Sequence, residues 1–144
     1  MTTAQEVFDA AMALMDEIDE NTGATDTPDT KEYKNKTLFI LNILRGELYP
    51  FSDNFMQRRE GKRPISVKIE NFEDALPLDD YICQTVMPYG LAAHLLIDEN
   101  PSTAGFCQQK YEELKAMLSQ GLPAVSEAII DLYDVIGYTE GARW

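Results

Sequence analysis

LDDYICQTVMPYGLAAHLLI, residues 78–97, holds the longest apolar run of the sequence, from about Met87 to Ile97. The run is too short and too interrupted to span a membrane. Its helical stripe consists of Ile82, Val86, Tyr89, Ala93 and Leu96. Pro88 lies inside this helix, where it removes a backbone donor and its ring clashes one turn back. We therefore expect Pro88 to kink the helix or to split it in two.

A first helix is expected at the start of the sequence. Thr3 with Glu6 three places later is a capping box, which marks the beginning of a helix. We expect this helix to run to the turn-forming residues Asn21-Thr-Gly23. Its apolar face is made of Ala4, Val7, Phe8, Ala11, Met12, Met15 and Ile18.

A second helix is expected from about Thr30 to Tyr49, and Pro50 ends it. Phe39 and Ile43 widen its apolar stripe, so we expect this helix to pack on two sides. The stripe itself consists of Tyr33, Thr37, Ile40, Leu41, Leu44 and Leu48.

The last clear helix is expected from Pro101, since proline suits the first helical position, to about Gln120. Its apolar residues are Ala104, Phe106, Cys107, Tyr111, Leu114, Met117 and Leu118. Residues 124–144 are expected to form a short helix and then a partly extended tail from about residue 137. Tyr138 and Trp144 in this tail are expected to dock on another surface, because exposed aromatic side chains are costly in water.

The segment of about residues 51–70 has a different character. Residues 64–69 alternate apolar and polar side chains, which is the strand period, so we expect a short extended or β arm here. The other segments carry the helical period. The sequence therefore predicts a mainly α protein, a small four- to five-helix bundle in a single domain spanning residues 1–144.

Charge is distributed unevenly along the 144 residues, which carry 25 acidic and 12 basic side chains for a formal net charge of −13. Residues 1–30 carry −8, residues 31–69 carry +5, and residues 70–144 carry −10. The acidic total argues against a protein that coats nucleic acid over its whole surface. A basic middle between two acidic flanks is the most unusual feature of this sequence.

The basic middle segment has three interpretations. It could bind a phosphate backbone, it could be a solvated loop, or it could contact the acidic flank of a neighbouring copy. The third fits the charge distribution best, because segregated charge favours head-to-tail association, which closes into a ring if the rotation allows. The basic candidates for an interaction site are Arg58, Arg59, Lys62, Arg63 and Lys68.

Candidates for catalysis or metal binding are few. One histidine and two cysteines cannot supply the four ligands of a zinc site. The sequence contains no phosphate-binding glycine loop, GxSxG or HExxH motif. We expect His94 to be packed or at an interface, and Cys83 and Cys107 to be reduced and buried. The sequence predicts a non-enzymatic protein without metal or cofactor, and an enzyme built on clustered carboxylates stays an alternative.

The stretch from Leu78 to Pro101, followed by Phe106 and Gln109-Lys-Tyr-Glu-Glu-Leu114, resembles small proteins encoded among the structural genes of tailed phages and prophages. The shared pattern is a Pro-Tyr-Gly-Leu-Ala-Ala helix, then Asp-Glu-Asn-Pro, then a helix with Tyr-Glu-Glu. The resemblance covers about residues 1–120. Some of these proteins look like head–tail connector (adaptor or head-completion) proteins, which are helical subunits that form a ring beneath the portal.

The resemblance implies a virion structural subunit at the portal–tail junction that acts by assembly and not by catalysis. Its implied partners are further copies of the chain and the portal and tail components. Genome DNA would pass by without specific binding, because an acidic lumen repels phosphates, and no membrane is involved. The implied location is the cytoplasm of a bacterial host and then the virion, which agrees with an acidic N-terminal segment unlike a signal peptide. The alternative is a DNA-binding or DNA-packaging accessory protein that uses the basic patch at residues 58–68.

Overall fold

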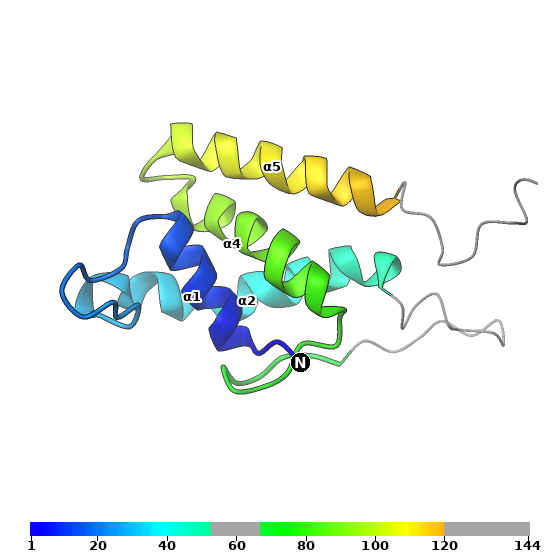
Figure 1. Ribbon diagram of the computed structural model, residues 1–144, viewed down its shortest axis with the longest axis horizontal. Helices are drawn as coiled ribbons and strands as arrows, with labels where there is room; N and C mark the ends of the chain where they lie inside the picture. The colour runs from blue at the N-terminus through cyan, green and yellow to red at the C-terminus, as the bar shows by residue number, and fades with distance from the viewer. Residues whose placement is uncertain (53–66, 120–144) are drawn as a thin grey trace, which may run out of the picture.

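The computed structural model describes residues 1–52 and 67–119, and within these ranges the chain is mainly helical, as the sequence predicts. The helices pack as a small bundle (Figure 1). The short 3-10 turns η1 (Pro28–Thr30) and η2 (Tyr49–Phe51) flank the second helix. The main elements are α1 (Ala4–Leu14), α2 (Lys31–Leu48), η3 (Ile82–Val86), α4 (Met87–Leu96) and α5 (Pro101–Ser119).

The helix α4 is the centre of the bundle. Figure 1 shows it between α5 on one side and α1 and α2 on the other, and it contacts all three. Every residue of α4 is buried except Tyr89 and His94. A helix with apolar residues on almost every side is typical of the interior of a bundle. The helix α4 therefore lacks the broad solvent-exposed face of an ordinary surface helix.

Pro88 is accommodated by a widened turn. The preceding residues form the π-helical segment η3, in which the Met87 N–H donates to the Ile82 carbonyl five residues earlier. Proline has no N–H for the usual bond to the residue four places back, and its ring would crowd the carbonyl of Gln84 in a regular α-helix. The helix therefore neither stops nor splits at Pro88, because the wider turn before it absorbs the proline.

The helix α1 begins as predicted but ends earlier than predicted. The Thr3 side chain accepts from the Glu6 N–H, and the Glu6 carboxylate accepts from the Thr3 N–H at 2.8 Å. The helix ends at Leu14 because Asp16 adopts a left-handed backbone with φ of 59°. The N–H of Glu17 then donates to the Met12 carbonyl at 2.8 Å, which is a Schellman closure. The expected extension to Asn21 is therefore wrong.

The expectation that α2 packs on two sides is also wrong in the described structure. Phe39 is 77% exposed and Ile43 is 66% exposed. The reason is tertiary: α2 packs one face against α1 and α4, while α5 lies over α4. On α5, Phe106 and Met117 are likewise exposed, although the sequence places them among its apolar residues.

The expected strand at residues 64–69 is not found where the chain is described. Residues 67–70 have no regular secondary structure, and residues 64–66 lie outside the described ranges. An isolated antiparallel bridge joins Thr3 and Ala75 instead. The Leu76 N–H donates to the Thr2 carbonyl at 2.8 Å, and the Ala4 N–H donates to the Asp74 carbonyl at 3.1 Å. This pairing fixes the chain between the arm and η3 against the start of α1.

Candidate interaction surface

An apolar strip runs along the solvent face of α2. Phe39 and Ile43 are one turn apart and so lie on the same face of the helix. A groove of about 390 Å³ separates this face from residues 68–70, and Phe39, Asn42 and Lys68 are among its lining residues. Single exposed apolar residues are ordinary, but two in succession beside a groove are typical of a contact surface.

The Asn42 side chain holds the far wall of this groove. Its Nδ2 donates to the Ile69 carbonyl and its Oδ1 accepts from the Ile69 N–H, both at 2.9 Å. Arg45 Nε donates to the same Oδ1 at 3.2 Å. Ile69 is buried, so its backbone groups would otherwise lack partners. The Asn42 side chain thus satisfies both backbone groups of Ile69, as a neighbouring strand would.

The other end of the arm is fixed to the same helix end. Ser52 is fully buried, and its Oγ donates to the Tyr49 carbonyl at 2.7 Å. Ser52 and Ile69 are therefore both held beside the C-terminal half of α2. The structure places Lys68 in the open, at the groove wall. The other predicted site residues lie outside the described residues: Arg58, Arg59, Lys62, Arg63, Tyr138 and Trp144.

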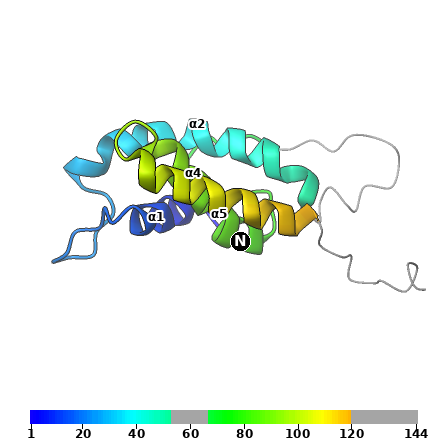
Figure 2. The ribbon, with the colours of Figure 1, turned by 90° about the horizontal axis from the view of Figure 1, so that it is seen from above.

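The opposite end of the bundle is acidic. Figures 1 and 2 show the loop after α1 and the turn between α4 and α5 at this end, away from the C-terminal ends of α2 and α5. Residues 15–30 carry six acids and no base, and Asp98 and Glu99 lie in the α4–α5 turn. Glu99 is held there by the hydroxyl of Tyr33, which donates to it at 2.7 Å. Acidic side chains from two separate segments of the sequence therefore gather at one end of the bundle.

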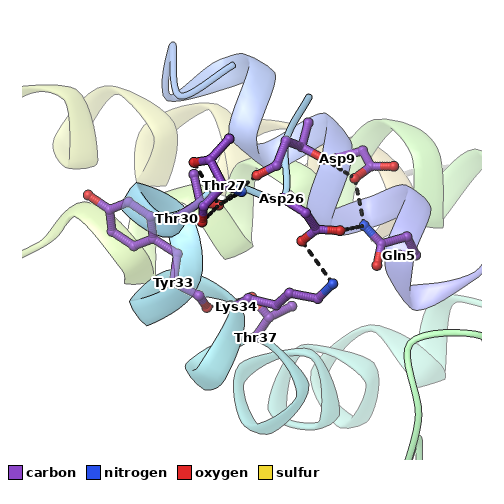
Figure 3. A network of polar contacts seen from close by, with 9 residues as sticks. Gln5, Asp9, Asp26, Thr27, Thr30, Tyr33, Lys34 and Thr37 are labelled. Carbon is purple, nitrogen blue, oxygen red and sulfur yellow. Dashed lines mark hydrogen bonds and ion pairs between the residues drawn. The ribbon is translucent and has the colours of Figure 1, made fainter. Parts of the chain in front are cut away.

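A polar network keeps the acidic loop in place (Figure 3). Asp9 accepts hydrogen bonds from Gln5 at 2.8 Å and from Thr25 at 2.6 Å. Lys34 pairs with Asp26 at 2.8 Å. The carboxylates in this network have protein partners, and no group of three or more metal-ligating side chains occurs in the described part of the chain. The network therefore fixes the position of the loop against α1 and α2.

A second groove, of about 330 Å³, opens between α4 and α5 near their connecting turn. His94 and Ile97 line it from the end of α4, and Ala104, Gly105 and Gln108 line it from α5. His94 is exposed at this groove and is not packed in the core, which leaves the predicted interface role as its remaining expectation. The sequence offered one signal for the groove, the glycine at position 105, whose missing side chain leaves the space open.

Two tyrosines tie α2 to the α4–α5 hairpin at both ends. Tyr111 of α5 donates to the Glu47 carboxylate of α2, and Tyr33 donates to Glu99. Burial, followed by the hydrogen bond to the partner carboxylate, raises the pKa of both phenols well above the usual range. The Nζ atom of Lys115 lies 3.7 Å from Oε1 of Glu47, so Glu47 contacts both Tyr111 and Lys115. Both tyrosines are neutral hydrogen-bond donors that fix helix positions.

The two cysteines are buried, as predicted. Burial, with the nearby carboxylates of Asp80 and Asp79, raises the pKa of the Cys83 thiol to about 12. Burial also raises the pKa of the Cys107 thiol. Thiols in this state are poor nucleophiles, so neither cysteine has the low pKa of a reactive one.

Comparison with known proteins yields no match to a family model, to a curated protein or to a solved structure. None of the helices that the structure describes is long and apolar enough to cross a lipid bilayer.

Proposed function

We propose that this chain is a structural subunit of a tailed-phage or prophage virion, a head–tail connector protein that works by assembling with further copies and with the portal. The observation that carries the proposal is the uneven charge of the chain. Residues 1–30 carry −8 and residues 31–69 carry +5, and the acidic loop 15–30 lies with Asp98 and Glu99 at one end of the bundle. Subunits that carry surfaces of opposite charge can associate head to tail.

The sequence resemblance supports the same role, because connector proteins of this kind are small helical subunits. The net charge of −13 also suits a component beside a DNA path, since like charge prevents the genome from sticking. The described residues hold partnered carboxylates and high-pKa thiols, which favour an assembly role over catalysis.

The test is made on particles purified from an induced host that encodes the chain. We expect mass spectrometry to find the chain in intact particles, and we expect cross-linking through exposed Lys68 to join it to a second copy or to the portal. Absence of the chain from purified particles would contradict the proposal. So would cross-links that place Lys68 far from every subunit boundary.

A further inference from the structure

We propose that residues 123–136 form a helix that folds back along one flank of α5 in the same chain, so that the two helices make an antiparallel hairpin about Gly121. The occupant lies outside the described residues, and its sequence and its place in the chain identify the surface that it covers. The inference goes beyond the proposed function and does not depend on it, because it concerns contacts within one chain.

The receiving flank of α5 carries apolar side chains that the described elements leave uncovered. Phe106 is 62% exposed and Met117 is 60% exposed. They are eleven positions apart, which is three helical turns, so they lie on one line along α5 about 16 Å apart. Lys110 and Glu113 lie between them on this line, and the aliphatic parts of such side chains can cover apolar surface.

The neighbours of α5 lie on its other sides. One face of α5 packs against α4. Lys115, which pairs with Glu47 of α2, is nine positions from Phe106 and therefore on the opposite side of the helix. The flank of Phe106 and Met117 is thus the side of α5 that faces away from α2.

Residues 123–136 carry an apolar stripe that requires a partner surface. Four apolar residues recur at the three- and four-residue spacing of one helical face: Val125, Ile129, Leu132 and Ile136. The acidic residues fall on the opposite face: Glu127, Asp131 and Asp134. A helix of this length is marginal in water by itself, so it becomes stable only when its apolar face is buried.

The short connection limits which surface this helix can reach. The helix α5 ends at Ser119, and Pro123 suits the first position of the next helix. Only residues 120–122 are left between them, with Gly121, a residue that commonly ends helices, in the middle. Connections of this length join antiparallel helices that are neighbours in space, so the nearest surface is α5 itself.

The same connection sets the register of the hairpin. Residues equally distant from Gly121 lie opposite each other, so Met117 faces Val125 and Phe106 faces Ile136. Both exposed apolar residues of the flank therefore meet a residue of the apolar stripe. Residues 138–144 then leave the hairpin at the end of the bundle that holds the α4–α5 turn, because Phe106 lies near the start of α5.

The first test is disulfide trapping in the full chain. Met117→Cys is combined with Val125→Cys, the expected partner, or with Glu127→Cys, which lies two residues further on the opposite face of the expected helix. The native thiols do not compete, because Cys83 and Cys107 are buried and burial raises the pKa of both. Met117 is exposed, so its replacement leaves the core unchanged.

We expect the pair with Val125→Cys to form a disulfide within one chain at least about 10-fold faster than the pair with Glu127→Cys, the effect of one well-buried apolar contact. Equal rates would overturn the inference, because a segment without a fixed partner brings both pairs together equally. Disulfide-linked dimers would also overturn it and assign the stripe to a second copy.

The second test is hydrogen exchange, and it uses the receiving flank. The double substitution Phe106→Ser with Met117→Ser should speed exchange of the amides in residues 126–136 about 10-fold, because it removes the apolar surface that the stripe covers. Phe39→Ser is the matched control, since Phe39 is equally exposed but lies on α2. Exchange that both chains leave unchanged would overturn the inference, as would an equal effect of the control.

Discussion

Gly90 sets the spacing of three helices through the side chain it lacks. A Cβ at this position would lie 2.9 Å from two ring atoms of Tyr111 on α5 and 3.1 Å from Leu44 on α2. The Tyr111 ring cannot move aside cheaply, because it is buried and its hydroxyl donates to Glu47. The close approach of α5 to α4 therefore depends on this one glycine.

Gly90→Ala is expected to lower the free energy of unfolding by about 1–3 kcal/mol, the cost of overpacking a core. Gly105→Ala is the matched control on α5, where the new Cβ meets open space. It should be neutral or stabilise the protein by up to about 1 kcal/mol through helix propensity. Urea unfolding measures both, and equal effects of the two substitutions would contradict the packing described here.

Cys83 links stability to alkaline pH. Its pKa is raised from the ordinary 9.0 to about 12 in the folded chain, and its thiol donates to the Leu78 carbonyl at 3.8 Å. The folded state holds this proton more tightly than the unfolded chain does. The stabilisation is therefore complete below pH 9 and is lost as the pH rises from 9 towards 12. Tyr33 and Tyr111 act in the same direction at higher pH still.

We expect the free energy of unfolding to fall as the pH rises from about 9, where the thiol ionises in the unfolded chain but stays protonated in the folded one. Cys83→Ala should reduce the slope of this fall, because it removes one of the titrating groups. Urea unfolding at several pH values in this window measures the slope. A slope that is the same in both chains would show that the thiol does not titrate as described.

At the scale of elements, the ends of helices were predicted well where a local signal sets them. Thr3 with Glu6 begins α1, Pro101 begins α5, and Leu48 ends α2 two residues before Pro50. The end of α1 was missed because Asp16 adopts the left-handed conformation that sequence patterns assign to glycine. The π-helical turn before Pro88 was not predicted, because a proline in a helical sequence can be accommodated by a kink, a break or a π-bulge, and the sequence does not distinguish these.

The candidate surface was predictable only in part. Lys68 is exposed, and it belongs to the basic cluster that the uneven charge distribution along the sequence indicates. The exposure of Phe39 could not be predicted, because periodicity shows an apolar face and not which neighbours cover it. The α4–α5 groove depends on how the two helices pack against each other, which a sequence pattern does not reveal. Gly105 is the one sequence feature that indicates the groove.

Asn42 makes the attachment of the arm testable at the scale of elements. Asn42→Ala removes both hydrogen bonds to Ile69 and leaves a buried N–H and carbonyl without these partners, at a cost of about 1–3 kcal/mol. We expect faster hydrogen exchange at the Ile69 amide, while amides in the interior of α5 exchange as before. Unchanged exchange at Ile69 would mean that the side chain does not anchor this segment. Asn35→Ala, on the same solvent face, is a suitable control.

The whole molecule is strongly acidic, and this predicts its behaviour towards DNA. With a net charge of −13, the chain should not bind duplex DNA measurably even at low salt. Replacing Arg58, Arg59, Lys62 and Arg63 by alanine should therefore change nothing in a binding assay. Salt-sensitive binding that these four substitutions weaken would instead support the DNA-binding alternative.

Association of copies through oppositely charged segments is the central claim of this account, and it makes assembly depend on both concentration and salt. The most direct measurement is native mass spectrometry of the purified chain over a concentration and salt series. We predict a closed oligomer of fixed size that dissociates as the ionic strength rises, because salt screens the attraction between the acidic segments of one copy and the basic residues 58–68 of the next. A monomer at every concentration and every ionic strength would contradict the account.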